Sequence, residues 1–129
     1  MTNLSNAIHV VLDDTAMTAA GRGNLLASRL IHRAHAESGW HLYAPACALV
    51  EADRARRGTA EHIATLPGIT VLDLDLAAAL AIAPHRTWAL AHTLHVAQPT
   101  PERPDGAIIA TVAPEAWNDH PVRILDLTS

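Results

Sequence analysis

Short runs of apolar residues alternate along the chain with longer segments in which apolar residues recur at helical spacing. The short runs are rich in β-branched residues, as is typical of buried strands, whereas the longer segments are typical of amphipathic helices. The pattern predicts strands near residues 8–13, 41–44, 69–74, 107–112 and 121–126. It predicts helices near residues 24–38, 46–57, 60–66, 76–83, 86–97 and 114–118. Strands that alternate with helices predict an α/β fold, a three-layer α/β/α sandwich around a mostly parallel sheet of about five strands.

Glycine and proline mark the expected ends of these elements. Gly39 and Gly58 stand where helices should end, and Pro45 stands at a first helical turn. Pro84 should divide the alanine-rich stretch into two helices, and the proline-rich segment 98–106 cannot form regular structure. No linker or internal repeat interrupts the pattern, so residues 1–129 are expected to form a single domain.

Composition excludes several classes of protein. No apolar stretch approaches the roughly 20 residues of a membrane-spanning helix, and residues 1–5 do not resemble a signal peptide. A single cysteine, Cys47, excludes an internal disulfide framework and is expected in the core. These features predict a cytoplasmic protein with no membrane contact. The net charge of −4 argues against strong, sequence-blind binding of nucleic acids, although a local cluster of arginines remains compatible with it.

The first predicted strand ends on two acids and a hydroxyl, Asp13, Asp14 and Thr15. Ligands of open α/β sheets bind at the carboxyl edge, where this strand ends. Two neighbouring carboxylates repel each other unless a cation lies nearby, so the arrangement predicts a hard metal ion bound by oxygens. The alternative is that Asp13 or Thr15 only caps the helix that follows.

A second candidate ligand, Glu51, lies in the helix predicted after the second strand. A right-handed crossover could place this helix beside the end of the first strand. Asp13 and Glu51 would then begin a Mg²⁺ or Mn²⁺ site, and such an ion lowers the pKa of a bound water and neutralises a phosphodiester. The alternative for Glu51 is a surface ion pair with Arg54, three residues further along a helix.

The segment Val11-Leu12-Asp13-Asp14-Thr15-Ala16-Met17 resembles the opening of a PIN domain, the fold of VapC-type toxin ribonucleases, although Asp14 departs from the family pattern. Leu42 to Glu51 resembles the family's second strand, its proline and its helix with a glutamate, which makes Glu51 the second metal ligand. Segments 71–76 and 122–127 resemble the family's third and last strands, so the likeness extends over nearly the whole chain.

The family has a third acid at the start of a helix and a fourth acid after its fourth strand. In one alignment Asp105 is the third acid, which leaves too few residues for the remaining elements. In the other, helix 86–97 is the acid-bearing helix and residues 107–111 are the fourth strand, so that Leu90 and Ala113 replace the two acids. The second alignment fits the length better, and Asp105, Glu115 or Asp119 could still supply a displaced acid from a loop.

The resemblance implies a Mg²⁺- or Mn²⁺-dependent endoribonuclease whose catalytic and metal-binding residues are Asp13, Glu51 and Asp105. It also implies RNA as substrate, a toxin role with a cognate antitoxin, and a homodimer. The alternative is a catalytically degenerate PIN-like protein that binds RNA or a protein without cleavage. A nucleotide-binding regulatory domain finds little support, because no glycine-rich loop follows a strand directly. The histidine pairs His32/His35 and His92/His95 lack a third zinc ligand at a specific spacing.

Overall fold

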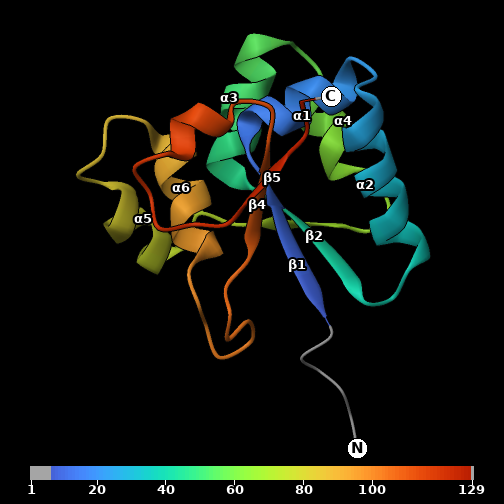
Figure 1. Ribbon diagram of the computed structural model, residues 1–129. Helices are drawn as coiled ribbons and strands as arrows, with labels where there is room; N and C mark the ends of the chain where they lie inside the picture. The colour runs from blue at the N-terminus through green and yellow to red at the C-terminus, as the bar shows by residue number, and fades with distance from the viewer. Residues whose placement is uncertain (1–6, 129) are drawn as a thin grey trace, which may run out of the picture.

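The computed structural model describes residues 7–128, which form one five-stranded sheet in which every strand pair is parallel. The strands follow the order β3-β2-β1-β4-β5 across the sheet (Figure 1). Their bounds are β1 Ile8–Leu12, β2 Trp40–Pro45, β3 Ile69–Leu72, β4 Ile108–Thr111 and β5 Ile124–Asp126. The predicted α/β class and parallel sheet are confirmed.

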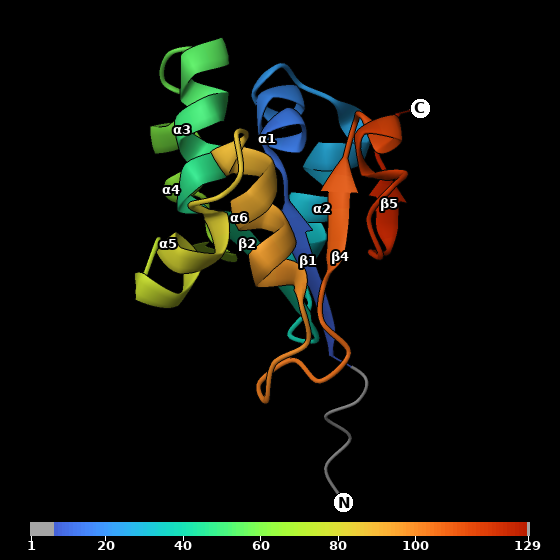
Figure 2. The ribbon, with the colours of Figure 1, turned by 90° about the vertical axis from the view of Figure 1, so that its left-hand side faces the viewer.

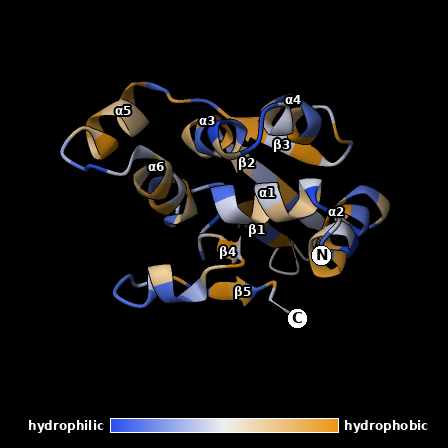
Figure 3. Ribbon diagram, turned by 90° about the horizontal axis from the view of Figure 1, so that it is seen from above, coloured by the Kyte–Doolittle hydropathy of each residue, from blue (hydrophilic) through white to orange (hydrophobic). Residues whose placement is uncertain are grey.

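Helices cover both faces of this sheet (Figures 1 and 3). Their bounds are α1 Asp14–Gly21, α2 Leu25–Ala36, α3 Ala46–Ala55, α4 Thr59–Ala64, α5 Leu76–Ile82 and α6 Trp88–Ala97, with a 3₁₀ turn η2 at Pro114–Trp117. Helices α1, α2 and α4 pack on one face and α6 on the other, with α5 packed against α6. Helix α3 contacts both α1 and α6, so it joins the two helical layers above the sheet (Figure 2).

The central strand β1 is buried on both faces because its side chains alternate between two cores. Val10 and Leu12 pack with Met17 of α1 on one side. Val11 packs with Ile109 of β4 and the residues of α6 on the other side. A strand covered on both faces needs a nearly continuous apolar run, which is why residues 8–12 carried so clear a signal in the sequence.

Several local predictions need correction. Gly39 and Gly58 do not end helices, because α2 has its C-cap at Glu37 and α3 at Arg56, and Gly58 is the N-cap of α4. The apolar pattern does not predict helix α1, because its eight residues bury only Ala16 and Met17 and therefore show no apolar stripe. Only the alternative role of Asp13 or Thr15 as a cap implied a helix there. The third strand ends at Leu72 and not near residue 74, since exposed residues follow it. None of the helices formed by residues 7–128 is long and apolar enough to cross a membrane.

The strand order places a topological switch point between β1 and β4. The chain proceeds outward from β1 through β2 to β3, then returns across the sheet to β4 and β5. The carboxyl ends of β1 and β4 therefore flank a crevice, and such crevices are where open α/β sheets bind ligands. The opposite, amino edge carries the irregular loop 98–107, which Figure 1 shows below the sheet beside the start of β1.

Gly106 supports this loop in a way that no other residue can. Its φ is +72°, and a Cβ atom there would overlap the carbonyl oxygen of Ala97. That oxygen accepts a hydrogen bond from the Ala107 N–H at 2.9 Å, and this bond links α6 to the start of β4.

We expect Gly106→Ala to lower the free energy of unfolding by about 2–4 kcal/mol, because it combines a left-handed backbone with a steric overlap. Urea denaturation measures this change. Gly39→Ala is the control, since Gly39 has no positive φ and nothing within 4 Å of an added Cβ. Equal stability of the two variants would contradict the assignment.

Candidate functional site

Asp13 lies at the carboxyl end of β1 and is almost fully buried, with 3% of its surface exposed. Its Oδ1 accepts hydrogen bonds from the Thr15 hydroxyl at 2.6 Å and from the Ala16 N–H at 2.8 Å. Its Oδ2 accepts from the indole N–H of Trp117 at 3.1 Å. Asp13 is thus the N-cap of α1, the alternative role that the sequence left open, and it also reaches the 3₁₀ turn that precedes β5.

Two threonines close the switch point between β1 and β4. The hydroxyl oxygens of Thr15 and Thr111 lie 3.1 Å apart, and the Val112 N–H donates to Thr15 at 3.1 Å. Because the Thr15 hydroxyl proton points to Asp13, the Thr111 hydroxyl must be the donor in the threonine pair. A chain of hydrogen bonds therefore runs from β4 to the buried carboxylate of Asp13.

Asp14 is the acid that faces solvent at this edge. It is half-buried in the first turn of α1 and lines a cavity of about 570 Å³. The other lining residues are Thr15, Thr18, Ala19, Arg22, Gly23, Asn24, Ala55 and Val112. Burial raises the pKa of Asp14, the charge of Asp13 raises it further, and Glu51 adds a smaller increase. The charges of Asp13, at the end of β1, and of Glu51, on α3, thus both act on Asp14 at the carboxyl edge.

The structure brings Asp13 and Glu51 to the same edge, as the sequence predicted, with Glu51 exposed on α3. Asp105 does not join them. Val10 of β1 is paired with Ile108 of β4, so Asp13 lies three residues beyond this pair and Asp105 three residues before it. At about 3.3 Å per residue Asp13 lies roughly 10 Å beyond the Val10–Ile108 pair, whereas Asp105 lies before that pair, in the loop at the amino edge. The assignment of Asp105 to a shared metal site is therefore corrected.

The second alignment, which rests on the resemblance, expected a helix over residues 86–97 and a strand over residues 107–111, and α6 and β4 lie in these segments. Helix α6 and strand β4 occupy the positions expected for the acid-bearing helix and the fourth strand, with Leu90 packed against the core and Ala113 just after β4. Within residues 7–128, no three His, Cys, Asp or Glu side chains are arranged to hold a metal ion.

Trp117 is the site residue that the sequence did not reveal. Its indole is 3% exposed and donates to Asp13 across 104 positions of the chain. The sequence gives no sign of this contact, because an indole can pack in a core without donating a hydrogen bond. No local pattern connects Asp13 with Trp117, and only the fold places the two residues together.

His92 is a second buried polar side chain, and it ties α6 to α3. Its Nδ1 accepts a hydrogen bond from the N–H of Cys47 at 3.2 Å, and burial lowers its pKa. A neutral His92 therefore serves the packing of the two helices. His32 and His35 are both exposed on α2.

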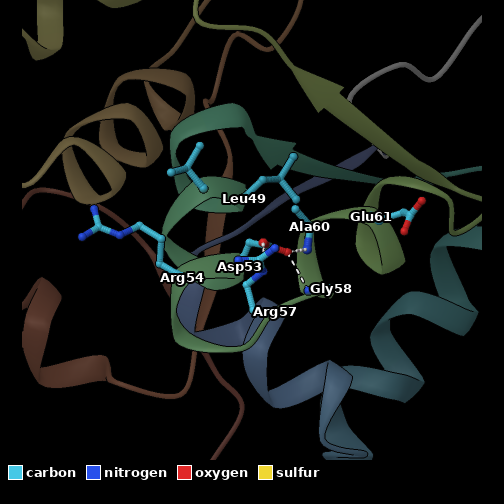
Figure 4. A pocket seen from close by; sticks show the side chains of 8 residues that line it. Leu49, Asp53, Arg54, Arg57, Gly58, Ala60 and Glu61 are labelled. Carbon is cyan, nitrogen blue, oxygen red and sulfur yellow. Dashed lines mark hydrogen bonds and ion pairs between the residues drawn. The ribbon is translucent and has the colours of Figure 1, made fainter.

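A separate hollow of about 560 Å³ lies between α3 and α4 (Figure 4). Asp53 is a half-buried acid in this hollow, and its Oδ1 accepts hydrogen bonds from the N–H groups of Gly58 at 2.9 Å and Ala60 at 3.0 Å. Asp53 thereby fixes the turn between the two helices, with Arg57 nearby at 4.0 Å. Asp53 therefore has a structural role at this hollow. Glu51, the candidate metal ligand, does not line the hollow.

Comparisons of the chain with models of protein families, with curated proteins and with solved structures found no significant match. The PIN-domain resemblance therefore remains a prediction that rests on the order of the elements and on the positions of Asp13 and Glu51.

We expect Trp117→Phe to lower the free energy of unfolding by about 1–3 kcal/mol, because it leaves one buried oxygen of Asp13 without its donor. Denaturant unfolding measures the loss, and Trp88→Phe, at a position 61% exposed, is the matched control. The same substitution should cost less in an Asp13→Asn background. Additive losses in the double variant would show that packing alone explains the effect.

Asp14 should make stability depend on pH. Since its pKa is raised in the folded protein, its favourable contribution is complete below the ordinary value of 3.8 and is lost as the pH rises through the folded-state pKa. We therefore expect Asp14→Asn to raise the thermal midpoint at pH 7, with an advantage that shrinks as the pH falls toward 4. Thermal unfolding at several pH values without divalent ions tests this. A midpoint difference that does not vary with pH would contradict it.

Proposed function

We propose that this protein is a Mg²⁺- or Mn²⁺-dependent ribonuclease whose cation is held at the carboxyl edge of the sheet. The observation that supports the proposal is the position of Asp14, which lines a cavity at the topological switch point and whose pKa is raised by burial and by the charges of Asp13 and Glu51. Carboxylates that repel one another in the absence of a cation are the donors that a hard divalent ion requires.

The three acids have different roles in this proposal. Asp13 already accepts three hydrogen bonds, so it positions α1 and Thr15. Asp14, which lines the cavity, and Glu51, which is exposed, would hold the ion, with waters and substrate phosphate completing the shell. When bound, the ion lowers the pKa of a coordinated water and offsets phosphodiester charge. Arg22, on the same cavity, would bind an adjacent phosphate of the RNA backbone.

The second candidate is a degenerate member of the same fold that binds a partner without cleavage. Two observations favour it. The oxygens of Asp13 are largely engaged within the protein, and an apolar surface remains on and around α5. Leu76, Leu80 and Trp88 are each more than half exposed there, as suits contact with an antitoxin or with a second copy of the chain. Both candidates are proposed for the cytoplasm: the first cleaves RNA there, and the second binds RNA or a protein partner without cleavage.

The decisive experiment measures cation binding and RNA cleavage in the same set of variants. We expect millimolar Mn²⁺ or Mg²⁺ to raise the thermal midpoint of the wild type at pH 7, because an ion that binds only the folded state stabilises it. Asp14→Asn and Glu51→Gln should each remove this rise and reduce cleavage of a labelled RNA panel at least tenfold. Glu61→Gln, an equal change of charge at an exposed position of α4, should leave both unchanged.

The outcomes separate the two candidates. Cleavage that needs the ion and is lost in Asp14→Asn would exclude the degenerate protein. A wild type that neither binds the ions by calorimetry nor cleaves any RNA of the panel would exclude the nuclease and favour the binding module.

A further inference from the structure

A small cavity of about 260 Å³ lies where α1 and α3 end and α4 begins. Its lining residues are Gly21, Arg56, Arg57, Gly58, Thr59 and His62, so within residues 7–128 it is lined by two arginines and a histidine and by no acid. The acids closest to it along the chain, Asp53 and Glu61, line the hollow between α3 and α4 instead, and Arg57 lies between the two. We call the smaller cavity the basic cavity.

The two arginines of the basic cavity differ in how far the fold uses them. The Nη1 of Arg56 donates to the carbonyl oxygen of Gly21 at 2.7 Å, at a helix end where a cation is favourable. The side chain of Arg57 is 95% exposed, and its ion-pair partner among the described residues is Asp53, 4.0 Å away. An exposed pair at this distance contributes little to stability. The Arg57 guanidinium is therefore free to meet a ligand, whereas Arg56 is already held in place.

Gly21 keeps the basic cavity open, although the backbone does not require a glycine there. It is the last residue of α1 and has no positive φ, and the left-handed position after this helix is taken by Gly23. A Cβ atom at Gly21 would lie 3.7 Å from the Arg56 Nη1 and 3.9 Å from the Thr59 hydroxyl, which is ordinary contact. A longer side chain at this position would occupy the space in front of both groups.

The basic cavity adjoins the cavity at the proposed metal site. Gly21 lines the first and Arg22 the second, and in the same way Arg56 lines the first and Ala55 the second. Consecutive Cα atoms are about 3.8 Å apart, so the two cavities flank the shared ends of α1 and α3. A nucleic-acid strand with one phosphate beside Asp14 would pass Arg22 and reach the basic cavity with a flanking phosphate.

We propose that the basic cavity binds a backbone phosphate of RNA that flanks the phosphodiester at the metal edge. The choice of RNA rests on the proposed function, whereas the choice of a phosphate rests on the residues of the cavity. Arg57 supplies charge-assisted hydrogen bonds to the phosphate, and Arg56 adds a guanidinium whose position is fixed by Gly21. His62, which is exposed at the rim, adds an imidazole N–H.

The first test measures binding of a labelled uridine dodecamer by fluorescence anisotropy, in EDTA so that neither a divalent ion nor cleavage contributes. We expect Arg57→Gln to weaken binding roughly three- to tenfold and to reduce the salt dependence of the binding constant by about 0.7, as for one phosphate of a single strand. Arg54→Gln is the matched control. It removes the same charge three residues earlier on α3, at an exposed position that lines the hollow between α3 and α4 and not the basic cavity.

A second pair of variants tests the cavity without changing any charge. Gly21→Leu fills the space in front of Arg56 and should weaken RNA binding as much as Arg57→Gln does. Gly21→Ala adds only a Cβ in ordinary contact, so it should bind RNA nearly as the wild type does. Thermal unfolding of each variant checks the fold. Should Gly21→Leu fail to fold, the comparison of Arg57→Gln with Arg54→Gln still decides the result.

Equal RNA binding by Arg57→Gln and Arg54→Gln would overturn the proposal, as would a wild type that binds no dodecamer in EDTA. Failure of the nuclease proposal gives a different result. A protein that binds RNA through the basic cavity but neither takes up Mn²⁺ nor cleaves removes the nuclease and retains this site. Metal-dependent cleavage that is lost in Asp14→Asn, together with unchanged binding by Arg57→Gln, retains the nuclease and removes this site.

Discussion

The carboxyl edge of this protein depends on one buried carboxylate. Asp13 ends β1, caps α1, holds Thr15 against Thr111 of β4 and accepts from Trp117 in the segment that leads to β5. A charge with 3% exposure is tolerated only where donors replace its water. Thr15 and Ala16 at the start of α1 supply two of these donors, and Trp117, 104 positions away, supplies the third. The switch point, where β1 and β4 diverge in topology, is therefore closed by hydrogen bonds to Asp13 as well as by apolar packing.

The adjacent acids Asp13 and Asp14 therefore have different roles: Asp13 stabilises the fold, and Asp14 lines the cavity where chemistry could occur. A carboxylate offers about four acceptor positions, and Asp13 has three of them occupied by protein donors. Asp14 cannot share those donors, since the backbone turns into α1 and leaves its side chain at the cavity. It is therefore the residue on which burial and like charges act, and their effect on its pKa is unfavourable for folding at neutral pH. Any cation-dependent chemistry at this edge would relieve that cost at Asp14 and not at Asp13.

The sequence predicted the layers and the sheet because β1 is buried on both faces and Pro84 separates α5 from α6. It also predicted that Asp13 and Glu51 share an edge, since each follows a parallel strand. It could not place Asp105, because length alone does not say which edge a loop residue occupies. Only the start of β4 at Ile108 fixes it at the amino edge. The Trp117 contact escaped prediction for a related reason, as it joins residues that no local pattern connects.

The net charge of −4 is a poor guide to what each edge can bind. Exposed charges separated by more than a Debye length, about 8 Å at physiological salt, hardly influence one another. Strand β1 joins two such regions. At its start, burial and the positive charges of His41 and Arg103 lower the pKa of His9. Just past its end, burial and the negative charges of Asp13 and Glu51 raise the pKa of Asp14. The two regions lie roughly 16 Å apart, at about 3.3 Å per residue over the five positions from His9 to Asp14, so each edge has its own local electrostatics and the net charge says little about what the carboxyl edge can bind.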